Sequence, residues 1–83
     1  MAIGDLTRPV SIRVVSMDKP GMLATLSQSF SSFGVNISQA NCKVTGDDRA
    51  VNTFEVAVGD SEQLRSLVHA LEKISGVISV ERV

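Results

Sequence analysis

The chain of 83 residues has no tryptophan and no tyrosine, and it holds only one cysteine and one histidine. A single cysteine, Cys42, excludes an internal disulfide and favours a reducing compartment. The only cysteine–histidine pair would join Cys42 to His69, and nothing in the sequence around them is typical of nucleophilic catalysis. We therefore expect no enzymatic activity from this chain alone. We also expect no cofactor and no metal site, because no second histidine or cysteine completes a ligand set.

Long apolar runs and an excess of one charge are also missing. No run approaches the ~18 residues that cross a membrane, and residues 1–5 lack the basic and apolar regions of a signal peptide. We therefore expect a cytoplasmic protein without membrane contact. Eight basic and nine acidic residues leave a net charge of −1, whereas independent nucleic-acid-binding domains usually carry a basic surplus. The charge therefore argues against DNA binding.

The residues that are present suffice for one small hydrophobic core, because 43% of them are hydrophobic. Alternation with a period of two predicts strands, and apolar positions three and four residues apart predict helices. The predicted strands are 10–17, 35–44, 49–58 and 77–82, and the predicted helices are 22–33 and a second one between Asp60 and Gly76. Asp60 with Gln63 resembles a capping box, and Gly34 and Gly76 are expected as C-terminal caps.

The element order, β-α-β-β-α-β, predicts an α+β ferredoxin-like plait. In this fold a four-stranded antiparallel sheet carries two helices on one face. We expect Val15, Met17, Val51 and Ala57 on the uncovered face, where partial apolar exposure predicts a partner. On strand 35–44 the small residues are expected beneath the helices, with Cys42 as a buried small hydrophobe and a bulge as an option. Ile78 and Val80 are expected to share one face.

Two short segments could bind a ligand. The turn Asp18-Lys19-Pro20-Gly21-Met22-Leu23 opens a helix, whose free N–H groups suit a carboxylate. The same residues are also compatible with a plain strand-to-helix turn. Asn36 could orient polar groups of a ligand, or it could bond to its own loop. Because these segments lie at opposite ends of one helix, a composite site would need a second protomer. A weaker RNA-facing cluster would comprise Arg13, Lys43 and Arg49.

The motifs on either side of the first predicted helix resemble the ACT domain, a small ligand-binding module of amino-acid-sensing metabolic enzymes. They are Asp18-x-Pro20-Gly21-Met22-Leu23 and Gly34-Val35-Asn36-Ile37. The resemblance covers residues 9–83, and residues 1–8 are expected to be a leader or linker. Residues 8–10, 36–40 and 74–83 are most similar to the C-terminal ACT domain of RelA/SpoT-type (p)ppGpp synthetase/hydrolases. Aspartokinases, acetolactate-synthase regulatory subunits and phosphoserine phosphatases carry similar domains.

The resemblance implies a homodimer with an amino-acid site at its interface. Carried over by position, the site comprises Asp18, Gly21, Met22 and Leu23 of one protomer with Asn36 and Ile37 of its neighbour. Met22 and Ile37 would shape an apolar pocket for a branched-chain side chain. The domain would then regulate linked GTP pyrophosphokinase or (p)ppGpp hydrolase domains. The alternative is a ligand-free module that docks on the ribosome or on another domain of its own protein.

Overall fold

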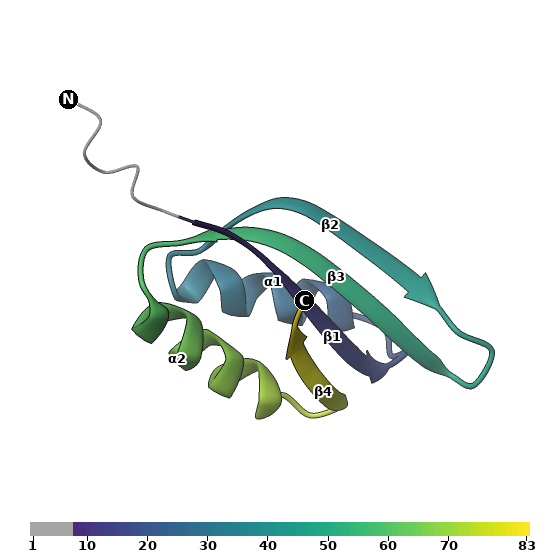
Figure 1. Ribbon diagram of the computed structural model, residues 1–83. Coiled ribbons are helices and arrows are strands. Elements are labelled where there is room, and N and C mark those ends of the chain that lie inside the picture. The colour runs from purple at the N-terminus through teal and green to yellow at the C-terminus, as the bar shows by residue number, and fades with distance from the viewer. Residues whose placement is uncertain (1–7) are drawn as a thin grey trace.

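Residues 8–83 of the chain are described by a computed structural model, in which four strands and two helices alternate as expected (Figure 1). The elements are β1 (Arg8–Met17), α1 (Met22–Ser32), β2 (Asn36–Val44), β3 (Arg49–Val58), α2 (Ser61–Glu72) and β4 (Val77–Arg82). The predicted leader, residues 1–8, lies outside the described residues except for Arg8, the first residue of β1. Neither described helix is long and apolar enough to cross a membrane.

The four strands form one antiparallel sheet in the order β2-β3-β1-β4. Both helices lie on the same face of this sheet (Figure 1). The ferredoxin-like plait predicted from the sequence is thereby confirmed. The long central strands β1 and β3 pair over ten residues each, from Arg8 opposite Val58 to Met17 opposite Arg49.

The core lies between the helices and the two central strands. Strict alternation on β1 and β3 turns one apolar set toward the helices, as predicted, because successive side chains point to opposite faces of a sheet. Phe30 of α1 and Phe54 of β3 are fully buried, and their rings are 4.7 Å apart. The other set leaves Val15, Val51 and Ala57 partly exposed on the uncovered face, with Met17 at its end. The occupants expected on that face are therefore confirmed.

One polar pair is buried among these apolar side chains. The amide of Asn52 donates to the hydroxyl of Ser16 at 3.1 Å and to the carbonyl of Val14 at 3.3 Å. Asn52 and Val14 are direct partners in the β1–β3 register. Because a slip of this register would strand a buried amide without partners, the pair favours one alignment of the two central strands.

Strand β2 departs from the expectation in its burial. A bulge between Ile37 and Gln39 shifts the register, and beyond it Ala40, Cys42 and Val44 face the helix side. These residues are nevertheless exposed, Val44 by 58%. The predictions that Cys42 is buried and that the small residues lie beneath the helices are wrong. The reason is that β2 is an edge strand and the β2–β3 hairpin runs on past the helices (Figure 1).

Near the C-terminal end of the chain, a shift in strand register affects Ile78, and the prediction for Gly76 is wrong. The β1–β4 register shifts between Val15 and Ser16, so that Val77 and Val80 pack against the core while Ile78 is 47% exposed. Ile78 has no partner in this register and lies outside the core. Gly76 does not cap α2, because the helix ends at Glu72 with Lys73 as its C-cap. Gly76 instead turns the chain into β4 with a positive φ of 97°.

Candidate functional site

The N-terminus of α1 is an open helix end. Its N-cap, Gly21, has a φ of 79° and offers no side-chain cap, and the first turn contains no acidic residue. The Thr25 N–H and hydroxyl both donate to the carbonyl of Gly21 at 3.0 Å. The N–H groups of Leu23 and Ala24 find no acceptor within residues 8–83. Two donors at the positive end of the helix dipole therefore face solvent, which is an arrangement that suits a carboxylate.

Two segments hold this turn in place from behind. The Met17 N–H donates to the carbonyl of Gly76 at 2.7 Å, and the Asp18 N–H donates to the carbonyl of Asp48 at 2.8 Å. The side chain of Met22 is buried in the core against Gly76, where an added Cβ would lie 2.6 Å from the Met22 methyl. The turn is consequently anchored to the hairpin and to the loop before β4, while its donors stay accessible.

The structure places the six predicted ligand residues in two groups. Asp18, Gly21 and Leu23 are exposed at the start of α1, whereas Met22 points into the core. Asn36 is exposed and Ile37 is half-buried at the start of β2, beyond the other end of the helix. Because α1 has eleven residues, its ends are about 16 Å apart at ~1.5 Å per residue. One protomer does not bring the two groups together, so the composite site stays a prediction.

The hairpin turn between β2 and β3 is held by its own side chains. The Thr45 hydroxyl donates to the carboxylate of Asp47 and to the carbonyl of Arg49, and Arg49 Nε lies 3.8 Å from Asp47 Oδ2. The hydrogen bond from Thr45, together with smaller contributions that include the nearby Arg49 charge, lowers the pKa of Asp47. Asp48 completes the turn with a φ of 61°, a conformation that aspartate tolerates better than most residues.

The three residues of the predicted basic cluster lie on the uncovered sheet face, where nearby acidic residues offset part of their charge. Arg13 lies opposite Glu81 of β4, and Lys43 lies opposite Val51. Arg49 is paired with Asp47. His69 is exposed on α2. Within the part of the chain that the structure describes, histidine, cysteine and acidic side chains form no group of three that could hold a metal ion.

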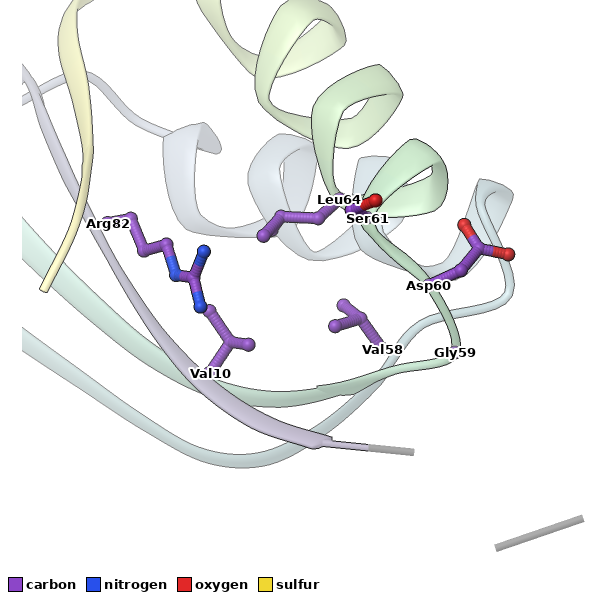
Figure 2. A pocket seen from close by; sticks show the side chains of 7 residues that line it. All are labelled: Val10, Val58, Gly59, Asp60, Ser61, Leu64 and Arg82. Carbon is purple, nitrogen blue, oxygen red and sulfur yellow. The ribbon is translucent and has the colours of Figure 1, made fainter. Parts of the chain in front are cut away.

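A cavity lies at the opposite end of the molecule from Gly21. This cavity of about 300 Å³ is lined by residues of β1, β3, α2 and β4, among them Val10, Val58, Leu64 and Arg82 (Figure 2). Sequence reasoning did not single it out. The available signal was the charged Arg82, two residues after Val80 in a strand whose alternation turns it toward the helices.

Many unrelated functions share this fold, and comparison with known families identifies the chain as one of a class of small regulatory modules. Residues 5–82 match the ACT domain family, and the chain belongs to it. The sequence is 58% identical over 80 residues to a GTP pyrophosphokinase of Myxococcus xanthus, covering 96% of this chain and 11% of the relative. It is 31% identical over 74 residues to the bifunctional (p)ppGpp synthase/hydrolase RelA of Mycobacterium tuberculosis, and this match covers 89% of the present chain and 10% of the relative.

The structural neighbours point the same way. The crystal structure of the ACT domain from the GTP pyrophosphokinase of Chlorobium tepidum superposes with a TM-score of 0.81 at 28% identity. This match covers 93% of the present chain and 99% of the other. The chain spans only about a tenth of the length of the curated relatives named above. The likeness to these enzymes is therefore a likeness to their ACT domain, as the sequence resemblance implied.

Proposed function

We propose that this chain is the ACT domain of a cytoplasmic (p)ppGpp synthetase/hydrolase and that it regulates the linked catalytic domains. The identity of 58% over almost the whole chain to a GTP pyrophosphokinase supports this parent. The mechanism is a shift of population: a ligand that prefers one arrangement of domains stabilises it by its difference in affinity. No described residue needs to take part in the reaction itself.

The ligand of this proposal is a branched-chain amino acid bound at a dimer interface. The observation that carries it is the open end of α1, where the N–H groups of Leu23 and Ala24 have no acceptor within residues 8–83. These donors would receive the carboxylate beside Asp18 and Gly21 of one protomer. Asn36 and Ile37 of the partner protomer would bond the polar end and cover the side chain, because one protomer holds the two groups too far apart.

The test is an NMR titration with valine, isoleucine and leucine, with light scattering on the same samples. The substitution Gly21→Val would strain a backbone with positive φ. A cleaner pair of variants is therefore Leu23→Glu and Leu23→Gln. Leu23 is 45% exposed in the first turn, and both replacements have the same size. The glutamate would place a negative charge beside the free donors and weaken ligand binding about tenfold or more by repulsion.

The expected result is saturable shifts at residues 21–24 and at Asn36 in the wild type and in Leu23→Gln, and their loss in Leu23→Glu. Light scattering should give the mass of a dimer. Equal affinity of the two variants would refute the carboxylate anchor. A monomer that binds with shifts at only one end of α1 would refute the composite interface.

The alternative is a ligand-free docking module that contacts the ribosome or another domain of the parent. The observation in its favour is the uncovered sheet face, where Val15, Met17 and Val51 lie beside Lys43. Under this alternative, reversal of the charges at Arg13, Lys43 and Arg49 lowers ribosome association of the full-length protein. A folded sample that responds to no amino acid in the titration would favour it.

A further inference from the structure

The cavity at the far end of the molecule has an architectural cause. Strand β4 pairs with β1 only from Ile12 onward, where Arg82 lies opposite it. The helix-facing side of β1 before Ile12 consequently lacks a neighbour from β4, and the first turn of α2 stands above the gap (Figure 2). The resulting cavity of about 300 Å³ is at the small end of the range typical of small-molecule sites.

The floor of the cavity is apolar. Val10 of β1, Val58 of β3 and Leu64 of α2 line it, and their side chains point into the same space (Figure 2). All three are almost fully buried by the surrounding protein. An aliphatic group that covered the remaining exposed surface would gain about 25 cal/mol per Å² of apolar area removed from water.

The wall of the cavity carries one cation. The guanidinium of Arg82 lies at the edge of the space above Val10 and points inward (Figure 2). It makes no ion pair within residues 8–83, where the single ion pair joins Arg49 to Asp47. Asp60, which also lines the cavity, accepts a hydrogen bond from the Gln63 N–H at 2.7 Å and turns its carboxylate away from Arg82 (Figure 2). The guanidinium is therefore free to bind a planar anion in bidentate fashion.

We propose that this cavity binds a small aliphatic carboxylate, with its hydrocarbon tail on Val10, Val58 and Leu64 and its carboxylate on Arg82. Ser61 also lines the cavity, and its hydroxyl points away from Arg82 (Figure 2). The carboxylate of Asp60 already accepts a hydrogen bond as the cap of α2 and is not needed to bind an amino group. The ligand therefore needs no amino group. This site is separate from the open end of α1 and does not depend on the amino-acid site proposed there.

The test is an NMR titration with sodium isovalerate and, as an uncharged match of the same shape, isovaleramide. The expected result is saturable shifts at Gly59, Ser61 and the methyl groups of Val10 and Leu64 with isovalerate only. Arg82→Gln should weaken binding about tenfold, since the charge-assisted hydrogen bonds to the carboxylate are lost. Arg65→Gln, which removes the same charge from an exposed position of α2 outside the cavity, should leave the affinity unchanged.

Four results would overturn the proposal: no saturable shift in the wild type, equal binding of isovaleramide, equal losses in Arg82→Gln and Arg65→Gln, or shifts confined to residues 21–24. The last result would assign the carboxylate to the open end of α1 and support the function proposed above. Arg82→Lys keeps the charge without the planar fork and should lose affinity only in part. Dispersed spectra of each variant establish that the fold is intact.

Discussion

The two helices of this domain begin in opposite ways. At α2, Asp60 accepts the N–H of Gln63 at 2.7 Å, and the Gln63 side chain accepts the N–H of Gly59 at 2.7 Å. The same glutamine donates to the carbonyl of Phe33 at 2.9 Å, which ties the helix to the end of α1. At α1, Gly21 provides no side chain and the first turn has no acid. The start of α2 thus has a side-chain cap and an acidic residue, Glu62, in its first turn, and the start of α1 has neither.

This difference separates the hydrogen-bonding groups that stabilise the fold from those that a ligand could use. A capped helix end contributes its hydrogen bonds to folding whether or not a ligand is present. An open end leaves them for water or for an anion, and the stability that a ligand adds depends on its concentration. Since α1 is anchored from behind through Met22 and Gly76, its open end costs the domain little rigidity.

The largest effect is expected from a change to that anchor. Gly76→Ala places a Cβ 2.6 Å from the Met22 methyl and imposes a side chain on a φ of 97°. We expect it to lower the free energy of unfolding by about 2 kcal/mol. Gly21→Ala is the matched control, because its φ is 79° and the space around it is open, and it should cost about 1 kcal/mol. Urea unfolding measures the free energy of unfolding of both variants. Equal losses would contradict the prediction, because they would mean that the Met22 side chain moves aside at no cost.

The next largest effect is expected at the capped start of α2. Asp60→Ala removes the acceptor for the Gln63 N–H and should lower the free energy of unfolding by about 1 kcal/mol. Ser61→Ala, one residue later and without a side-chain hydrogen bond in residues 8–83, should change it by less than about 0.5 kcal/mol. Thermal unfolding measures both. Indistinguishable midpoints for Asp60→Ala and the wild type would contradict the contrast between the two helix starts.

A smaller effect of opposite sign is expected at the open end. Leu23→Glu adds a negative charge to the first turn of α1 and should raise the free energy of unfolding by about 0.3–1 kcal/mol at low salt, relative to Leu23→Gln. The gain should shrink as salt is added. Chemical unfolding in two salt concentrations checks this. A glutamate without effect would mean that the dipole at this end is already compensated.

The smallest effect is a pH dependence of the hairpin to which the open end is tied. The pKa of Asp47 is lowered in the folded state, so its contribution is present above the ordinary aspartate value and is lost as pH falls through the folded value. Acidification should therefore loosen the turn, visible as a lower protection factor of the Thr45 amide, and Asp47→Asn should remove this dependence. The reverse trend, protection that grows with acid, would contradict the Thr45–Asp47 contact.

The features that could be predicted from the sequence are those with local causes. Asp60 and Gln63 stand three residues apart, and the positive φ of Gly34 follows from its place after a helix. Alternation on β1 and β3 was also readable, because both are central strands that bury one face. The uncapped turn at Gly21 could be located, although its anchoring by Gly76 joins residues far apart in the chain and leaves no local pattern.

The features that could not be predicted depend on partner strands. The exposure of Cys42 follows from the place of β2 at the sheet edge and from the reach of the helices, neither of which its own residues encode. Ile78 lies outside the core because the β1–β4 register shifts, and an apolar strand of six residues does not reveal which alternation applies. The cavity beside Arg82 exists because β4 and β1 overlap only in part, a relation between two strands rather than a motif.

The bulge in β2 has a consequence for how sequences of this fold vary in length. At the bulge the Ser38 hydroxyl donates to the carbonyl of Glu55 at 3.0 Å, and pairing resumes at Gln39 opposite the same glutamate. Loss of one residue here would restore a regular strand without turning its remaining side chains over, whereas the same loss elsewhere in β2 would reverse them. A single-residue gap at Ser38 in an alignment of such domains would therefore remove one hydrogen bond and leave every other side chain of β2 on its present face.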